Sequence, residues 1–169
     1  AAIKSENEMA GASTGGLDQN ASMRCTAGHA LLLDCRPEPT PLENVSQQEF
    51  DLDKYNLELL VVDTQAPHQL NDGQYAQRRA TCEEAAKILG VANLRVTADG
   101  ISKADDQFQA LKETLDALPD ETMKKRVRHV VTEIERVRSF VRAFAQGDIK
   151  AAGRLFNASH DSLAADYEV

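Results

Sequence analysis

Residues 123–144 read MKKRVRHVVTEIERVRSFVRAF, and the apolar side chains of this stretch recur at alternating intervals of four and three residues. The repeating residues are Met123, Val127, Val130, Ile134, Val137, Val141 and Phe144. Because an α-helix turns once in about 3.6 residues, this spacing places all of them on one face. The stretch therefore predicts a long amphipathic helix from about Asp120 to Gln146, closed by Gly147.

Another helix is predicted ahead of this one. Asn71 and Asp72 are suitable N-caps for a helix that runs to Leu89, where Gly90 provides a stop signal. From about residue 71 onward nearly every feature of the sequence is helical, so we expect a second domain over residues 71–169.

Two more helices flank the long one. The helix before it begins at Ser102 and ends at Pro119, and its apolar residues repeat at helical spacing: Ala104, Phe108, Leu111, Leu115 and Leu118. The helix after it is capped by Asp148, and its apolar residues are Ile149, Phe156 and Leu163. Antiparallel helices that pack on one another and on a short sheet are the expected outcome.

Residues 1–70 differ, because small residues, turn formers and short aliphatic runs dominate them. A short helix is expected over Leu17–Cys25. His29–Arg36 (HALLLDCR) and Leu57–Asp63 (LELLVVD) have strand length and predict buried strands, with a weaker strand between them near Val45–Leu52. The fold class is therefore α+β, with strands first and an antiparallel helical bundle second.

Composition excludes several classes of protein. The chain has 169 residues, of which 42% are hydrophobic, which is enough for a core and rules out a disordered tail. The net charge of −8 disfavours nucleic acid as a partner, because phosphate neutralisation needs a basic excess. No window approaches the length of apolar chain that a membrane span needs, so we expect no membrane association.

Cysteines and histidines give no metal site. Cys25, Cys35 and Cys82 match no CxxC pattern and favour buried or idle thiols in a reducing cytoplasm. The four histidines are scattered through the sequence, at His29, His68, His129 and His160. The chain starts at Ala1 without an initiator methionine and stops at Val169 without a cap, which suggests a segment of a longer protein.

Two features invite a chemical interpretation. The glycine-rich residues 11–16 lead into a helix with Asp18 in its first turn, where an anion or a sugar hydroxyl can be held and an aspartate can act as a base. Ordinary helix capping explains the same pattern, and on these residues alone it is favoured. The seven basic residues between Lys124 and Arg142 are interspersed with Glu133 and Glu135, which favours a solvated helix face over a phosphate-binding surface.

A series of motifs runs through the chain in order: Gly15–Gln19 (GGLDQ), Gly28–Arg36 (GHALLLDCR), Asp72–Arg79 (DGQYAQRR), Cys82–Glu84 (CEE), Arg128–Glu133 (RHVVTE), Ser159–Leu163 (SHDSL) and Asp166–Val169 (DYEV). Over essentially the whole chain this series resembles galactokinases, which belong to the superfamily of galactose, homoserine, mevalonate and phosphomevalonate kinases. The resemblance implies a fragment of a two-lobed α+β sugar kinase, in which residues 1–70 are part of the N-terminal lobe and residues 71–169 form the helical part of the C-terminal lobe.

The resemblance also implies the reaction and its residues. Galactokinases move the γ-phosphoryl of Mg-ATP onto the C1 hydroxyl of α-D-galactose in the cytoplasm. By position, Asp18 matches the catalytic aspartate, which takes or orients the hydroxyl proton. Gly15 matches a glycine whose backbone contacts the sugar, and Tyr75 matches the tyrosine whose hydroxyl holds galactose. The substrate-binding residues implied are thus Gly15, Asp18 and Tyr75, the cofactors are ATP and Mg²⁺, and no residue of this chain is assigned to either cofactor.

The sequence departs from the galactokinase pattern at several places. Gly16 stands where an aliphatic residue is usual, Ser13 where a proline is common, and Pro67 where many members have a basic residue that His68 partly replaces. The N-terminal sugar signature, the Pro-x-Gly-x-Gly-Leu-Ser-Ser phosphate loop and the C-terminal glycine-rich motif are absent from the sequence. We therefore expect the parent enzyme to be active and this chain alone to be inactive, with exposed apolar surface that promotes self-association.

Two alternatives stay open at the level of sequence. The first is a galactokinase-like sensor, which binds sugar and nucleotide and acts through a protein partner without turnover. The second is a helical interaction module, suggested by the apolar repeat of residues 123–144.

Overall fold

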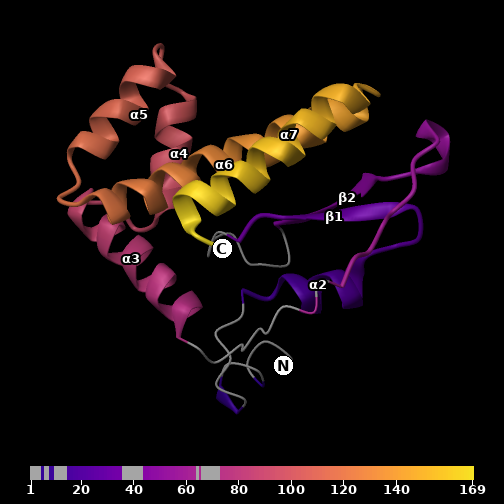
Figure 1. Cartoon of the computed structure of the whole chain (residues 1–169), viewed down its shortest axis with the longest axis horizontal. Coiled ribbons are helices and arrows are strands. Elements are labelled where there is room, and N and C mark those ends of the chain that lie inside the picture. The colour runs from indigo at the N-terminus through magenta and orange to yellow at the C-terminus, as the bar shows by residue number, and fades with distance from the viewer. Residues whose placement is uncertain (1–4, 6–7, 10–14, 36–43, 64, 66–72) are drawn as a thin grey trace. The chain divides into compact units, whose positions relative to one another are not determined.

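The structure is a computed structural model that describes residues 5, 8–9, 15–35, 44–63, 65 and 73–169. It divides the chain into two compact units, Ala1–Gln74 and Tyr75–Val169 (Figure 1). Helices together with a two-stranded antiparallel sheet confirm the α+β class. The sequence predictions made for Ser13, Pro67, His68, Asn71 and Asp72 lie outside the described residues.

The first unit contains one helix and a β-hairpin. Helix α2 spans Leu17–Arg24, strand β1 spans His29–Leu33, strand β2 spans Val45–Glu49 and a 3₁₀ turn spans Asp53–Tyr55. The strands pair antiparallel from His29 opposite Glu49 to Leu33 opposite Val45. The short helix, the first strand and the weak second strand are therefore found where the sequence predicted them. Strand β1 is half-buried rather than buried, because Ala30–Leu33 keep part of their surface in solvent.

The predicted strand Leu57–Asp63 is wrong. These residues have no regular secondary structure, and the side chains of Leu59, Leu60 and Val61 are 79%, 84% and 82% exposed. A strand exists only when its backbone N–H and C=O groups pair with a neighbour, and within the described residues the sheet consists of β1 and β2 alone. An aliphatic run of strand length therefore does not suffice to make a strand.

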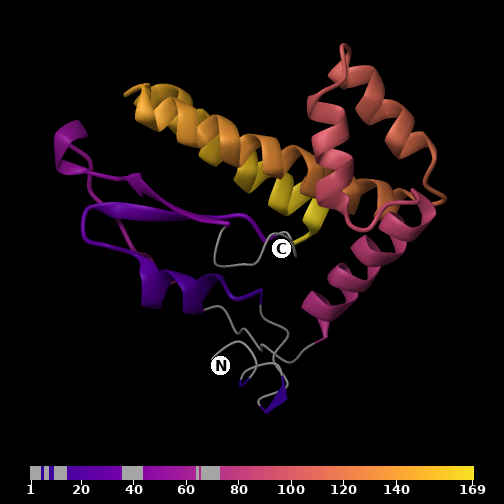
Figure 2. The ribbon, with the colours of Figure 1, turned by 180° about the vertical axis from the view of Figure 1, so that it is seen from behind.

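The second unit is helical. Its elements are α3 (Gln74–Ile88), α4 (Leu94–Ser102), α5 (Gln107–Asp116), α6 (Glu121–Ala145), α7 (Ile149–Ser162) and a π-helical turn η2 (Leu163–Tyr167). Helix α7 runs back alongside α6 after the short connection Gln146–Asp148, as both ribbon views show (Figures 1 and 2). None of the helices in the described part of the chain is long and apolar enough to cross a membrane.

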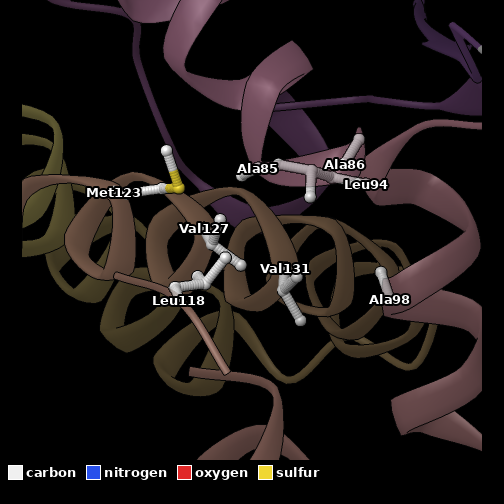
Figure 3. Packing of buried hydrophobic residues seen from close by; sticks show 8 residues of the cluster. All are labelled: Ala85, Ala86, Leu94, Ala98, Leu118, Met123, Val127 and Val131. Carbon is white, nitrogen blue, oxygen red and sulfur yellow. The ribbon is translucent and has the colours of Figure 1, made fainter. Parts of the chain in front are cut away.

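The core of this unit lies where α3, α4 and α6 meet. It consists of Ala85, Ala86, Leu94, Ala98, Leu118, Met123, Val127 and Val131 (Figure 3). Val127 is fully buried, and the small side chain of Ala98 allows α4 to pack closely on α6. The first part of the apolar repeat therefore packs inside the chain, whereas Val137 further along is 41% exposed, so the helical interaction module stays a prediction.

Aspartates cap the starts of α6 and α7, and the cap predicted at Asp148 is confirmed. The Asp120 carboxylate accepts a hydrogen bond from the Met123 N–H, and the Asp148 carboxylate accepts one from the Ala151 N–H, each at 2.9 Å. Gly90 and Gly147 follow α3 and α6 with φ of 68° and 74°, a left-handed conformation that favours glycine.

The helix predicted from Ser102 is wrong in its boundaries. Ser102 ends α4, a helix that the sequence analysis did not predict, and a separate helix α5 begins after Asp106. The Asn93 side chain caps α4 by accepting from Arg95 and Val96, and the Asp106 side chain caps α5 by accepting from Gln109. The two caps, Asn93 and Asp106, each begin a separate helix. Each side chain accepts hydrogen bonds from the first N–H groups of its helix, which have no carbonyl partner within that helix.

Candidate functional site

The start of α2 is built on an unusual backbone. Gly16 is the N-cap residue, is buried, and has φ 85° and ψ 11°, in the left-handed region. Its carbonyl accepts from both the backbone N–H of Asn20, at 3.1 Å, and the Asn20 side chain, at 2.8 Å. A β-branched residue at position 16 would be strained in this conformation. Glycine in place of the aliphatic residue usual in galactokinases therefore suits the local geometry.

Asp18 lies in the first turn of α2 and is exposed, as is Gly15 just before the helix. At this position the helix dipole stabilises a negative charge, and the carboxylate is open to a ligand. The other end of α2 is tied to the hairpin, since the Gln47 side chain of β2 donates to the Arg24 carbonyl at 2.6 Å. The structure thus places Gly15 and Asp18 together at the accessible end of an anchored helix.

Tyr75 lies in the other unit, in the first turn of α3, and its surface is 49% exposed. A joint site made by Gly15, Asp18 and Tyr75 stays a prediction, because the two units are each described by themselves.

A cluster in the second unit was not found from the sequence. Tyr167, in η2, lies against three side chains: the guanidinium groups of Arg126 and Arg78 are 5.3 Å and 5.8 Å from its ring centroid, and the His129 ring is 4.5 Å away. Arg126, which is only 7% exposed, donates to the Asp166 carbonyl and to the Glu168 carboxylate, both at 2.7 Å. We call residues 166–168 the C-terminal turn.

The interpretation of the basic residues as a solvated face is therefore wrong for Arg126 and Arg128. Arg128 holds both carboxylate oxygens of Asp166, and its hydrogen bond lowers the pKa of that carboxyl below the usual range. Further along α6, Arg136 pairs with Glu133 and Arg138 with Glu135 inside the helix, but Arg136 is only 15% exposed and Arg138 also binds Asp99 of α4 at 2.6 Å. The interpretation as a solvated face holds for Arg142, whose side chain is 60% exposed. The signal in the sequence is the pair of acidic residues Asp166 and Glu168, which can form ion pairs with arginines of α6.

Burial shifts the pKa values of Tyr167 and of the titratable groups around it. Burial above all, and then the neighbouring Cys82, raises the pKa of Tyr167 to about 12. Burial also raises the pKa of the Cys82 thiol. The pKa of His129 is lowered by burial and then by Arg136, and its Nδ1 lies 2.9 Å from the Ser162 hydroxyl. These groups stay neutral at neutral pH, which fits a structural cluster better than an acid–base site.

No group of three His, Cys, Asp or Glu side chains that could hold a metal ion occurs in the part of the chain that the structure describes. The residues that carry the chemical interpretation therefore remain Asp18 and Gly15 at α2, and Tyr75 at α3.

No family model matches the chain. Curated proteins named galactokinase match almost all of it: 41% identity over 98% of the chain for the protein of Streptomyces coelicolor, 38% over 98% for that of Haemophilus influenzae, and 38% over 99% for that of Mycobacterium bovis.

These matches confirm the resemblance read from the motifs: the chain is related to galactokinases over nearly its whole length. It spans 40%, 39% and 42% of the length of these three relatives.

Proposed function

We propose that this chain is the central segment of a galactokinase, in which the γ-phosphoryl group of ATP passes to the C1 hydroxyl of α-D-galactose. The observation that carries the proposal is the identity of 41% with a protein named galactokinase over 98% of the chain. In this proposal, residues 1–70 belong to the N-terminal lobe and residues 71–169 to the helical part of the C-terminal lobe of a cytoplasmic enzyme.

Asp18 is the proposed catalytic residue. Its carboxylate accepts or orients the proton of the sugar hydroxyl, so that the oxygen is aimed at the phosphorus. Three features support this role: Asp18 is exposed, it lies in the first turn of α2, and α2 follows a backbone turn at Gly16. A hydroxyl of the sugar meets the backbone of Gly15, and the Tyr75 hydroxyl binds the sugar from α3.

The proposal gives no residue of this chain to ATP or Mg²⁺. Among the described residues no group of three His, Cys, Asp or Glu side chains could hold a metal ion, and the sequence contains no Pro-x-Gly-x-Gly-Leu-Ser-Ser loop. We assign both to other parts of the parent enzyme and derive no step through residues of this chain. We also propose that the chain by itself is inactive and self-associates through side chains such as Phe108 and Phe156, which are 79% and 61% exposed.

The test is a comparison of two proteins, the full-length product of the gene that encodes this chain and the 169-residue chain alone. Each is incubated with Mg-ATP and D-galactose, and galactose 1-phosphate is measured by phosphorus NMR. We expect product from the full-length protein and none from the chain. Binding of galactose and ATP without turnover would favour the sensor, and no galactose binding by the full-length protein would refute both.

A further inference from the structure

The first half of α3, which carries Tyr75, has little packing of its own. Among residues 74–80, all of which the structure describes, Arg78 alone is not exposed. The second half differs, because Ala85 and Ala86 are buried in the core against α6 (Figure 3). Arg78 is therefore the partly buried side chain of this half, and its contacts bear on where the half lies.

Arg78 is held by the C-terminal turn. Its Nε donates to the Tyr167 carbonyl at 2.9 Å, and its Nη2 donates to the Glu168 carbonyl at 2.7 Å. The guanidinium also lies 5.8 Å from the centroid of the Tyr167 ring. Two hydrogen bonds from one planar group to adjacent carbonyls fix both distance and orientation, and a lysine ammonium lacks this rigid planar pair of donors.

The C-terminal turn is in turn fixed to α6. Arg126 binds the Asp166 carbonyl and the Glu168 carboxylate, and Arg128 binds the Asp166 carboxylate. Arg126 is buried, and α6 carries the core residue Val127, so this attachment joins the turn to a helix of the core. A continuous path of contacts therefore runs from α6 through the turn to Arg78.

Tyr75 lies three residues before Arg78, so the two side chains share one face of α3. Tyr75 is also within electrostatic reach of Tyr167, although burial and Cys82 affect the pKa of Tyr167 more strongly. A shift of Arg78 relative to the turn moves the Tyr75 side chain directly, since both belong to the same two turns of helix.

We propose that Arg78 is a positioning residue for Tyr75: held by the carbonyls of Tyr167 and Glu168, it keeps the first turn of α3 where the Tyr75 hydroxyl meets the sugar. This inference rests on the proposed function, in which Tyr75 binds galactose. Arg79 provides a matched control, because it is the next residue, is exposed, and pairs only with Glu83 one turn later among the ion pairs of the described chain.

The anchor itself is tested in the 169-residue chain by amide hydrogen exchange. We expect Arg78→Lys to speed exchange of the amides of residues 78–82 by about tenfold and to leave those of residues 125–140 unchanged, while Arg79→Lys changes neither. Equal exchange in the two variants would overturn the anchor. This readout does not depend on any activity.

The positioning role is tested by steady-state kinetics of the full-length protein. We expect Arg78→Lys to raise KM for galactose about tenfold, with kcat changed less than about twofold and KM for ATP unchanged. Arg79→Lys is expected to match the wild type.

The possible outcomes distinguish failure of the proposed function from failure of the positioning role of Arg78. If the wild type has no kinase activity, the proposed function fails, and the role for sugar binding fails with it even if the exchange result supports the anchor. If the wild type is active but Arg78→Lys leaves KM for galactose unchanged, or lowers kcat and affects both substrates alike, the positioning role is overturned while the proposed function stands.

Discussion

The two units of the chain differ in how they bury apolar surface. In Tyr75–Val169, eight core residues pack between α3, α4 and α6, whereas among the described residues of Ala1–Gln74 only Gly16 is buried. The proposed catalytic Asp18 lies in the unit with little burial, and Tyr75 lies in the unit with a core. The free energy of unfolding of the isolated chain should therefore come mainly from the second unit. Substitutions in that core should lower stability, whereas substitution of Asp18 should lower activity without lowering stability.

The largest expected effect comes from a charge placed in the core of the second unit. Val127→Asp puts a carboxylate where the side chain is fully buried, and we expect a loss of about 4 kcal/mol in the free energy of unfolding. Urea unfolding of the 169-residue chain, followed by circular dichroism, measures it. The matched change in the first unit, Leu60→Asp, affects a side chain that is 84% exposed and should cost less than about 0.5 kcal/mol.

Equal losses for these two variants would contradict the comparison, because Leu60 would then contribute to a core that the structure does not give it. A loss for Val127→Asp below about 1 kcal/mol would equally contradict the burial of α6.

A smaller effect is expected at the attachment of the C-terminal turn. Asp166→Asn removes the charge that Arg128 holds with two hydrogen bonds, and we expect a loss of about 2 kcal/mol in the free energy of unfolding. Asp161→Asn, at an exposed position on α7, is the control and should be nearly neutral. If both variants have the same stability, the turn is not fixed by this ion pair.

The smallest effect is a dependence of stability on pH through His129. Since its pKa is lower in the folded chain than in the unfolded chain, the unfolded chain binds the proton first as pH falls below the ordinary value of 6.5. Stability should therefore decrease on acidification through this range, and thermal melting at pH 7.5 and pH 5.5 measures the decrease, both values being about one unit from that pKa.

The variant His129→Gln should reduce this decrease. Asp166, whose pKa is lowered, acts in a more acidic range, because its stabilising charge is lost only below its ordinary value of 3.8. An unchanged pH profile in His129→Gln would remove His129 as the cause.

The sequence predicted the parts of the fold that local physics determines. The repeat from Met123 to Phe144 predicted α6 almost to the residue, because amphipathic periodicity and the stop signal at Gly147 point to the same helix. The strand predicted over Leu57–Asp63 is wrong, because a strand needs a neighbouring strand to pair with and no local sequence pattern specifies that neighbour.

In the candidate site, too, local features were predicted and long-range contacts were not. Asp18 and Gly15 were identified by a motif and lie at a helix start, as such motifs require. The attachment of Arg78, Arg126 and Arg128 to residues 166–168 was missed, because these contacts join residues up to 90 positions apart in the sequence. Side-chain pairs of this kind are determined by tertiary packing, and the periodicity of α6 alone favours pairs within the helix.

The central claim is that Asp18 performs the chemistry of a galactokinase, and one pair of variants tests it most directly. In the full-length protein, Asp18→Asn should lower kcat for galactose phosphorylation by about three orders of magnitude with little change in KM, because the carboxylate acts on the reacting hydroxyl. Asp53→Asn, an exposed carboxylate of the same unit, should keep wild-type kcat. Retention of most activity by Asp18→Asn, or an equal loss in both variants, would contradict the account.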